Sequence, residues 1–419
     1  MKHIYFSGIG GAGLGPLAEI AQDAGYLVSG SDLRESLFTK QLEKRGLDIV
    51  FEQTRNNIEA ENLTNPVDWL VYSSALSNSH PELAYAKENK IKISKRDEFL
   101  NEFLKIQKLQ LIAVAGTHGK TTTTGMLIWA FEQLGLPISY SIGTTLSFGP
   151  SGKYDPASKF FIYEADEYDR NFLNFSPKIS ILPSVGYDHV DIYKTVEDYK
   201  DAFRQFVSQS ETTLMFKKTE DYLTPLNGDF TAYDHSAPMS EIALPGQIRR
   251  DDAYLVKQAL LQINDFNESE IDDILSKYPG SGRRFEKLTP NLISDYAHHP
   301  TEIKATIEMG LEINPNLVVV YQPHQNERQL QLIDKYKDVF KGVKQLYWLP
   351  TYLPPGDREK HDKTLQPKDF ISKLSNTKAT AAEMNTELWQ AIEAHIAAND
   401  LVIAMSAGNL DTWLRNNVN

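Results

Sequence analysis

Short apolar segments alternate with amphipathic segments along the whole chain. This is the pattern of strands that alternate with helices, and such alternation predicts mostly parallel sheets. The clearest strands are expected at residues 3–6, 26–31, 69–74, 111–115, 159–164, 178–185, 317–321, 345–349 and 401–405, and a third unit is expected to begin at 292. The chain is therefore predicted to have an α/β fold of three units, without a tandem repeat.

Helix signals lie between these strands. Pro81 stands where the first turn of a helix tolerates proline, and a helix over 121–134 would end at Gly135, which suits a C-terminal cap. A later helix, beginning after Thr195, repeats apolar residues at the spacing of one buried face. The residues of that face are Val196, Tyr199, Phe203 and Phe206.

The length of the chain predicts several domains. Its 419 residues exceed the roughly 250–300 at which a single hydrophobic core stops growing. A charged connector is expected around residues 95–108, and a glycine-rich segment, 279–286, closes the second unit. The predicted domains are 1–107, 108–287 and 288–419.

One apolar strand runs directly into a loop suited to phosphate. Residues 111–115 are followed by Gly116-Thr-His-Gly119, then by Lys120 and four threonines at the start of a helix. Glycines let backbone N–H groups approach phosphate oxygens, the lysine reaches a β- or γ-phosphate, and the first threonine hydroxyl can ligate Mg²⁺. The loop is shorter than the general P-loop pattern, and it predicts a nucleoside triphosphate site.

Acids and a histidine follow the next strands of this unit. Residues 159–164 form an apolar strand that ends at Glu164 and is followed by Ala-Asp-Glu167. A strand of this kind delivers an acid toward the phosphate loop, so Glu164 is the expected Mg²⁺ ligand. His189 follows the strand at 178–185 and is expected at the same sheet edge. Surface charge and a structural histidine are the alternative interpretations.

The N-terminal unit opens with a second glycine loop, Gly8-Ile-Gly-Gly-Ala-Gly13, between a strand and a helix. Asp32 stands 19 residues after Gly13, about where a ribose-binding acid stands in dinucleotide sites. The same loop serves any diphosphate, including that of a UDP-sugar, so a lone Gly-x-Gly-x-x-Gly does not establish NAD. Ser73 and Ser74 are expected at a strand end, where open α/β sheets bind ligands, although turn serines explain them equally well.

Composition narrows the classes of function. A net charge of −13 argues against nucleic acid and anionic membranes as partners, and the absence of cysteine excludes thiol catalysis and disulfides. The N-terminus enters a strand pattern at once, and no apolar run approaches the ~18–20 residues that span a bilayer. A soluble, cytoplasmic protein is expected.

Taken in order, these motifs resemble those of the Mur ligases of peptidoglycan synthesis. The further matching segments are Asp188-His189, Arg283-Arg-Phe-Glu286 and Asp295-Tyr-Ala-His-His-Pro-Thr-Glu302, so the resemblance covers essentially the whole chain. It implies a Rossmann-like UDP-binding domain, a central P-loop ATPase domain and a C-terminal Rossmann-like domain that closes over the site. It also implies ATP and Mg²⁺, and a reaction in which ATP activates a muramyl carboxylate that an amine then attacks.

The resemblance implies roles for individual residues. Lys120, Glu164, His189 and Arg328 would be catalytic. The metal ligands would be Thr121, Glu164 and His189, and ATP would contact Gly116, Thr117, His118, Gly119, Lys120, Thr121, Thr122, Arg284 and Asp295. The UDP-sugar would contact Gly8, Gly10, Gly11, Ala12, Gly13, Asp32, Ser73 and Ser74, and the amino acid would contact His298, His324 and Arg328.

Within the family, the chain most resembles the branch that adds L-alanine to UDP-N-acetylmuramate. The branch that attaches a murein tripeptide to the same nucleotide sugar is the alternative, because Gln325 and Asn326 depart from the alanine-adding pattern. The family's adenine-binding Gly-x-His-Asn-x-x-Asn-Ala appears here as Gly246-Gln-Ile-Arg-Arg-Asp-Asp-Ala253, which keeps the first glycine and the last alanine but not the His-Asn pair. An oxidoreductase and a P-loop regulatory module are further alternatives, and a monomer or homodimer is expected.

Overall fold

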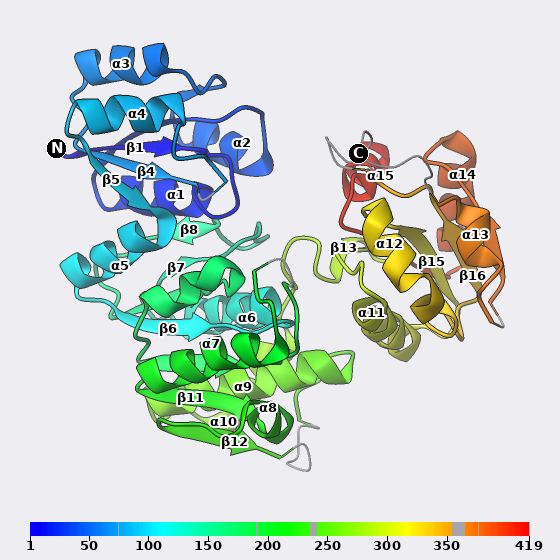
Figure 1. Ribbon diagram of the computed structural model, residues 1–419. Helices are drawn as coiled ribbons and strands as arrows, with labels where there is room; N and C mark the ends of the chain where they lie inside the picture. Colours follow the sequence, from blue (N-terminus) through cyan, green and yellow to red (C-terminus); the bar gives the residue numbers. More distant parts are fainter. Residues whose placement is uncertain (74, 190–191, 235–240, 354–364, 376, 419) are drawn as a thin grey trace. The chain divides into compact units, whose positions relative to one another are not determined.

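The structure is a computed structural model that describes residues 1–73, 75–189, 192–234, 241–353, 365–375 and 377–418. It contains three sheets, each formed by strands that alternate with helices along the chain (Figure 1). The predicted α/β fold with mostly parallel sheets is therefore confirmed. Contacts group the chain into two compact units. The first is Met1–Ala243 with Asp251–Tyr278, and the second is Leu244–Arg250 with Pro279–Asn419.

The first sheet has five parallel strands in the order β3-β2-β1-β4-β5. Its central strand is buried along its whole length, as expected when helices cover both faces of a parallel sheet. The strands are β1 (His3–Ser7), β2 (Leu27–Ser31), β3 (Ile49–Val50), β4 (Trp69–Tyr72) and β5 (Lys92–Lys95). The helices are α1 (Gly15–Asp23), α2 (Leu37–Lys44), α3 (Arg55–Thr64), α4 (Pro81–Glu88) and α5 (Arg96–Gln107).

The prediction of a charged connector at 95–108 is wrong, because residues 96–107 form helix α5. Phe99, Leu100 and Phe103 of this helix are fully buried, and Phe99 packs edge-on against Phe6 at 5.7 Å and Trp69 at 4.9 Å. The charged side chains that suggested a linker occupy the other positions of an amphipathic helix. The segment is thus part of the core of the first unit.

The second sheet has seven strands in the order β12-β11-β10-β6-β9-β7-β8, with only β8 antiparallel to its neighbour. The strands are β6 (Gln110–Val114), β7 (Ser139–Ser141), β8 (Gly152–Lys153), β9 (Phe160–Glu164), β10 (Ile179–Leu182), β11 (Thr212–Phe216) and β12 (Phe230–Tyr233). The helices are α6 (Lys120–Gln133), η1 (Tyr168–Asn174), α7 (Val196–Gln209), α8 (Lys217–Leu223), α9 (Gln247–Ile263) and α10 (Glu268–Ser276). β6, which carries the phosphate loop, lies between β10 and β9, so the residues that follow all three strands meet at one edge.

The predicted apolar face of α7 is confirmed at three of its four positions. Tyr199, Phe203 and Phe206 are fully buried, but Val196 is 43% exposed because it is the first residue of the helix. The hydroxyl of Thr195 accepts the N–H of Asp198 at 3.1 Å and caps this helix. The face packs on Phe172 of η1, which covers the same side of the sheet.

The third sheet has six strands in the order β13-β14-β18-β15-β16-β17, and only β13 is antiparallel. β15 and β18 pair along their whole length and are completely buried. The strands are β13 (Glu286–Thr289), β14 (Leu292–Asp295), β15 (Leu317–Gln322), β16 (Gln345–Trp348), β17 (Ala379–Ala381) and β18 (Leu401–Ser406). The helices are α11 (Pro300–Ile313), α12 (Asn326–Leu332), η2 (Ile333–Tyr336), α13 (Pro367–Ile371), α14 (Thr386–Ala397) and α15 (Leu410–Val418).

Helix α1 of the first sheet packs directly on β8, the edge strand of the second sheet. The carboxylate of Glu19 accepts the N–H of Gly152 at 2.6 Å, and that of Asp23 accepts the N–H of Tyr154 at 3.0 Å. A Cβ at Gly152 would lie 2.0 Å from the carbonyl oxygen of Pro16, so only glycine permits this approach. The first two sheets therefore share one packed interface.

Candidate active site

The phosphate loop connects β6 to α6 and is fixed on both sides by backbone hydrogen bonds. The N–H of Ala115 donates to Ile181 at 3.0 Å, and that of Thr117 donates to Ser184 at 2.8 Å. Gly116 and Gly119 adopt φ values of +140° and +88°, which favour glycine. A Cβ at Gly119 would also meet the Asp252 carboxylate of α9 and the ring of Pro183, each at 2.8 Å.

The loop presents unsatisfied donors at the start of α6. Gly119 is the N-cap and provides no side-chain cap, and the first N–H to find a helical acceptor is that of Thr123, at 2.9 Å from the oxygen of Gly119. The preceding N–H groups of the first turn therefore point outward with the positive end of the helix dipole, which is an anion site. Of the four threonines, Thr123 and Thr124 are fully buried, so only Thr121 and Thr122 border the loop.

Lys120 is held by a buried acid. Its ammonium lies 2.8 Å from Oε2 and 3.0 Å from Oε1 of Glu167, which is fully buried just beyond β9. Burial raises the pKa of the Glu167 carboxyl, but the charge of Lys120 and a hydrogen bond from His189 outweigh burial, so the pKa lies below its usual value. An ionised Glu167 thus fixes the position of Lys120.

His189 joins the same network from the loop after β10. Its Nε2 lies 3.1 Å from Oε1 of Glu167. A carboxylate can only accept, so Nε2 carries the proton, and this hydrogen bond raises the pKa of His189 although partial burial lowers it. No hydrogen bond to Nδ1 is found within the described part of the chain. A histidine oriented by a carboxylate in this way offers its other nitrogen to a ligand.

Thr121 and Glu164 face each other as the sequence predicts. The hydroxyl of Thr121 donates to Oε1 of Glu164 at 2.5 Å, and the N–H of Gly143 donates to Oε2 at 2.9 Å. A hydroxyl and a carboxylate are oxygen donors suited to Mg²⁺, which usually takes few protein ligands and keeps waters and phosphates. Among the described residues no group of three or more His, Asp or Glu could itself hold a metal.

The N-terminal glycine loop uses much of its own hydrogen-bonding capacity. The N–H groups of Gly8 and Ile9 donate to Ser31 at 2.8 and 3.0 Å, and that of Gly10 donates to Oδ2 of Asp32 at 2.8 Å. Gly11 donates to Gly8 at 3.2 Å. In this structure Asp32, expected to contact the UDP-sugar, binds the glycine loop.

The serine after β4 lies beside this loop. The N–H of Ser73 donates to Ser7 at 3.1 Å, and a Cβ at Gly8 would be 3.1 Å from the Cβ of Ser73. Ser74, which was predicted with it, lies outside the described residues. β4 ends at Tyr72, two residues before the predicted end, so Ser73 belongs to the loop that follows the strand.

In the second unit, both carboxylate oxygens of Asp295 accept hydrogen bonds from neighbouring residues. Its Oδ2 accepts the N–H of Phe285 at 2.7 Å, and Oδ1 accepts the N–H of Ala297 at 2.8 Å and the hydroxyl of Thr306 at 3.1 Å. Burial raises its pKa although the charge of Arg284 lowers it. The guanidinium of Arg284 lies over Tyr296, 4.9 Å from the ring centre.

The three residues predicted to contact the amino acid lie together in the second unit. The rings of His298 and His324 are 6.3 Å apart, and His324 stacks on Tyr352 at 5.7 Å. Burial lowers the pKa of His298, and the nearby charge of Arg328 lowers it further, against the opposing effect of Glu302. No described residue hydrogen-bonds the guanidinium of Arg328, which projects from α12. A neutral histidine beside an open guanidinium is suited to a carboxylate ligand.

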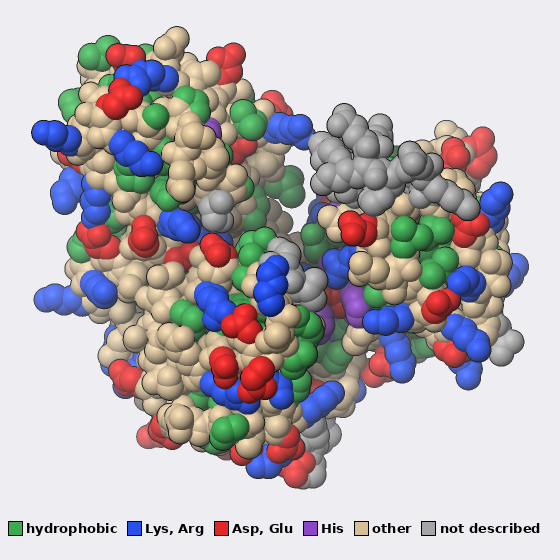
Figure 2. All heavy atoms as spheres, in the orientation of Figure 1, with side chains coloured by type: hydrophobic (Ala, Val, Ile, Leu, Met, Phe, Trp, Pro, Cys, Tyr) green, Lys and Arg blue, Asp and Glu red, His purple; other side chains and the backbone are tan. Residues whose placement is uncertain are grey.

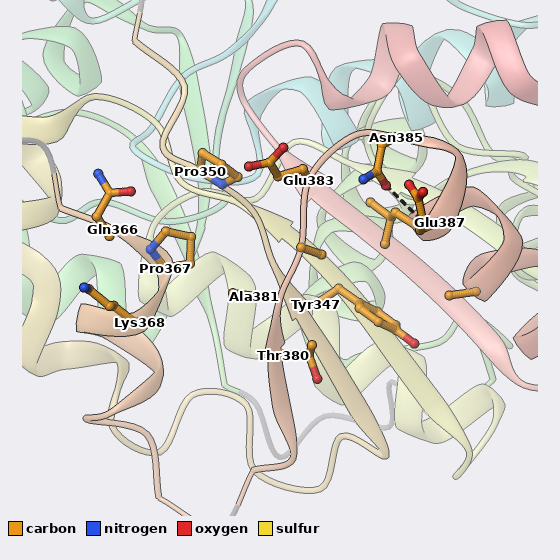
Figure 3. A pocket seen from close by; sticks show the side chains of 13 residues that line it. Tyr347, Pro350, Gln366, Pro367, Lys368, Thr380, Ala381, Glu383, Asn385 and Glu387 are labelled. Atoms are coloured by element: carbon orange, nitrogen blue, oxygen red, sulfur yellow. Dashed lines mark hydrogen bonds between the residues drawn. The ribbon is translucent and has the colours of Figure 1, made fainter.

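A further cavity of the second unit lies away from these residues. It has a volume of about 610 Å³ and lies at the ends of β16 and β17, beside the first turn of α14 (Figure 3). Tyr347, Lys368, Glu383 and Asn385 line it, and none of the predicted site residues does. On the face shown in Figure 2, acidic and basic side chains are interspersed, and no basic stripe is visible.

Three models of protein-family domains match successive parts of the chain. The model of the Mur ligase family catalytic domain matches residues 3–108, that of the middle domain matches 114–232, and that of the glutamate ligase domain matches 283–408. A protein of Agathobacter rectalis named UDP-N-acetylmuramate--L-alanine ligase is 32% identical, over 97% of this chain and 96% of its own. The chain belongs to the Mur ligase family.

Other relatives of this Mur ligase are similar along their whole length. A Clostridium perfringens protein with the same name is 30% identical over 98% of this chain and 96% of its own. The structure of UDP-N-acetylmuramate-alanine ligase MurC from Thermotoga maritima has a TM-score of 0.79 at 23% identity and covers 100% of this chain and 98% of that one. A murein peptide ligase from Psychrobacter arcticus has a TM-score of 0.67 at 22% identity with the same coverage. These two structures show the shared fold.

Sequence reasoning missed two side chains that lie beside the predicted loops. Glu167 was seen only as one of several acids after β9, although it is the acid that contacts both Lys120 and His189. Arg96 was assigned to a linker, although its side chain reaches the N-terminal glycine loop. An apolar repeat at Phe99, Leu100 and Phe103 could have identified the helix that carries it.

Proposed function

We propose that this Mur ligase joins L-alanine to the muramyl carboxylate of UDP-N-acetylmuramate at the expense of ATP, and that it acts in the cytoplasm in peptidoglycan precursor synthesis. The observation that carries the proposal is the name shared by the relatives that are 30–32% identical along nearly the whole chain. The phosphate loop supports it, because its donors and Lys120 are placed for a nucleoside triphosphate. None of the described helices is long and apolar enough to cross a bilayer.

The reaction proceeds in two steps. An oxygen of the muramyl carboxylate attacks the γ-phosphorus of ATP, the bond to the β-phosphate oxygen breaks, and an acyl phosphate and ADP form. The amine of L-alanine then attacks the acyl carbon, inorganic phosphate leaves, and the nitrogen loses a proton. In both steps negative charge develops on the oxygen of a leaving phosphate group, first on ADP and then on inorganic phosphate, so cationic groups and N–H donors fixed in advance lower the barrier.

The residues around the phosphate loop fit this task. The first N–H groups of α6 would bind the terminal phosphates, and Lys120 would neutralise the moving phosphoryl group. Glu167 holds Lys120 and His189 in place before the substrate arrives, at 2.8–3.1 Å. This preorganisation means that no large rearrangement of the two side chains has to accompany phosphoryl transfer.

The residues also fit Mg²⁺. Thr121 and Glu164 would hold it through the hydroxyl and carboxylate oxygens that face each other at 2.5 Å, and Nδ1 of His189 would be available to a second ion. When bound, Mg²⁺ supplies positive charge that offsets the charge of the phosphates. In the second unit, we propose that His298, His324 and Arg328 bind the amino acid, and that Arg284 and Asp295 approach the nucleotide. The domain limits 1–107, 108–287 and 288–419 belong to the same proposal.

The test is phosphate release from ATP with UDP-N-acetylmuramate, Mg²⁺ and a panel of amines: L-alanine, L-serine, glycine and a murein tripeptide. Release that requires both the nucleotide sugar and L-alanine is the expected result. Turnover with the tripeptide but not with alanine would assign the protein to peptide recycling. No release with any pair, together with tight ATP binding, would favour a regulatory module, and a bound dinucleotide in the absorbance spectrum would favour an oxidoreductase.

A further inference from the structure

The side chain of Arg96 lies against the last glycine of the N-terminal loop. A Cβ at Gly13 would be 2.8 Å from both Cδ and Nη1 of Arg96. Gly13 is not among the residues with positive φ. The chain therefore needs glycine at this position for space, and the space is filled by a guanidinium.

Two nitrogens of this guanidinium are fixed by acids. Nε and Nη2 donate to the two carboxylate oxygens of Asp97 at 3.1 and 3.3 Å, and Nη2 lies 3.6 Å from Asp166. Asp97 is itself buried, and the hydroxyl of Tyr163 on β9 donates to it at 2.9 Å. The remaining nitrogen, Nη1, has no hydrogen bond to any described residue. The fork is thus rigid, with one donor left open beside Gly13.

The glycine loop has open donors at the same place. The N–H groups of Gly8, Ile9, Gly10 and Gly11 are satisfied within the first unit. Those of Ala12 and Gly13 find no acceptor in the described part of the chain. They directly precede α1, whose N-terminal dipole adds positive potential.

The position of Arg96 is not explained by the stability of its helix. Arg96 is the first residue of α5, where the helix dipole favours acids over cations. Burial opposes its charge, and the neighbouring acids Asp97 and Asp166 raise its pKa, so the guanidinium remains a cation. The open N–H of Nη1 and the two open backbone N–H groups therefore form a set of donors suited to an anionic oxygen.

We propose that Arg96, together with the N–H groups of Ala12 and Gly13, binds an anionic oxygen of the nucleotide sugar. The proposal rests on the proposed function and adds a residue to its substrate site. UDP-N-acetylmuramate carries such oxygens in two groups, the diphosphate and the muramyl carboxylate. Arg96 lies between Gly13 of the glycine loop and Asp166, which stands two residues after Glu164, so it adjoins both the glycine loop and the segment that follows β9.

Titration calorimetry without ATP or amino acid tests the proposal. Arg96→Gln should weaken binding of UDP-N-acetylmuramate by roughly tenfold or more, the loss typical of a charge-assisted hydrogen bond. UDP-N-acetylglucosamine, which lacks the carboxylate, identifies the group. Equal weakening for both ligands assigns the diphosphate, and weakening for the muramate alone assigns the carboxylate. Arg45→Gln is the matched control, because Arg45 is also held by a fork, on Gln22 and Asp23, away from the loop.

Binding by Arg96→Gln within twofold of wild type would overturn the proposal. If that variant is unstable, Gly13→Ala provides the second measurement, because its methyl group would lie 2.8 Å from Cδ and Nη1 of Arg96, displace the guanidinium and weaken binding in the same way. Normal binding by folded Gly13→Ala would also overturn it. Wild-type protein that binds neither UDP nor UDP-N-acetylmuramate would contradict the proposed function itself.

Discussion

The buried carboxyl of Glu19 makes the docking of α1 on β8 sensitive to pH. Glu19 is 2% exposed, and burial raises its pKa from 4.5 to about 7 although the N–H of Gly152 and the charge of Arg45 lower it. A carboxyl with a raised pKa costs stability when it is ionised, so the cost develops as pH rises from 4.5 to 7 and is complete above that. The shift corresponds to about 3 kcal/mol, since one pKa unit is ~1.36 kcal/mol.

Glu19→Gln removes this charge and keeps an oxygen that can accept the N–H of Gly152. At pH 8 the variant should be more stable than wild type by up to about 3 kcal/mol, or a Tm higher by about 5 °C for a unit of roughly 270 residues. At pH 5 most of this stabilisation should be absent. The Tm values of the two proteins should then differ by no more than about 1 °C beyond any pH-independent effect of the amide. Thermal unfolding followed by circular dichroism at both pH values measures the difference.

The control is Glu43→Gln on the exposed side of α2. This variant should show no difference between its Tm shifts at the two pH values. The reasoning is refuted if Glu19→Gln changes Tm equally at pH 5 and pH 8, because the buried charge would then contribute nothing.

Four further variants test the site. Lys120→Ala should abolish phosphate release while nucleotide-sugar binding by calorimetry stays within about twofold, and turnover within tenfold of wild type, under ~1.4 kcal/mol of barrier, would contradict the phosphate-loop assignment. His189→Ala should raise the Mg²⁺ concentration for half-maximal activity; an unchanged Mg²⁺ titration would show that His189 is not a ligand. Gly10→Val should weaken UDP-sugar binding and leave ATP binding unchanged, because its new Cβ would meet protein atoms at 2.7–3.0 Å and displace the loop; equal loss for both ligands would indicate unfolding. Arg328→Lys should raise KM for L-alanine roughly tenfold or more, as a bidentate contact becomes a point charge, with KM for ATP unchanged; equal effects on both would indicate a structural role.

Local signals in the sequence were sufficient for the phosphate loop and for the strands that carry it and its neighbours. The sequence did not predict eight of the strands in the structure, namely β3, β5, β7, β8, β11, β12, β13 and β17. Lys120, Thr121 and Glu164 could be assigned because each adjoins an apolar strand, and parallel strands bring their carboxyl ends to one edge. The pairing of Thr121 with Glu164 at 2.5 Å follows from the register of β6 and β9, which adjacent apolar runs make easy to anticipate.

Contacts that depend on packing could not be anticipated. Asp32 had the spacing of a ribose ligand, but in the structure its carboxylate accepts the N–H of Gly10, and only the turn after β2 determines that choice. Arg96 and Gly13 are 83 residues apart, and their contact requires α5 to cross the end of the first sheet. The sequence suggested a connector instead of this helix because most residues of α5 lie on its polar face.

The close fit of Pro16 on Gly152 has a consequence for how the protein can be divided. β8 is a two-residue edge strand, and an uncovered edge offers its backbone to any extended chain that meets it. Here α1 covers that edge and its carboxylates occupy the N–H groups of Gly152 and Tyr154. A fragment that starts after the first sheet would expose the edge and self-associate. Helix α1 therefore keeps this edge of the sheet from pairing with another chain.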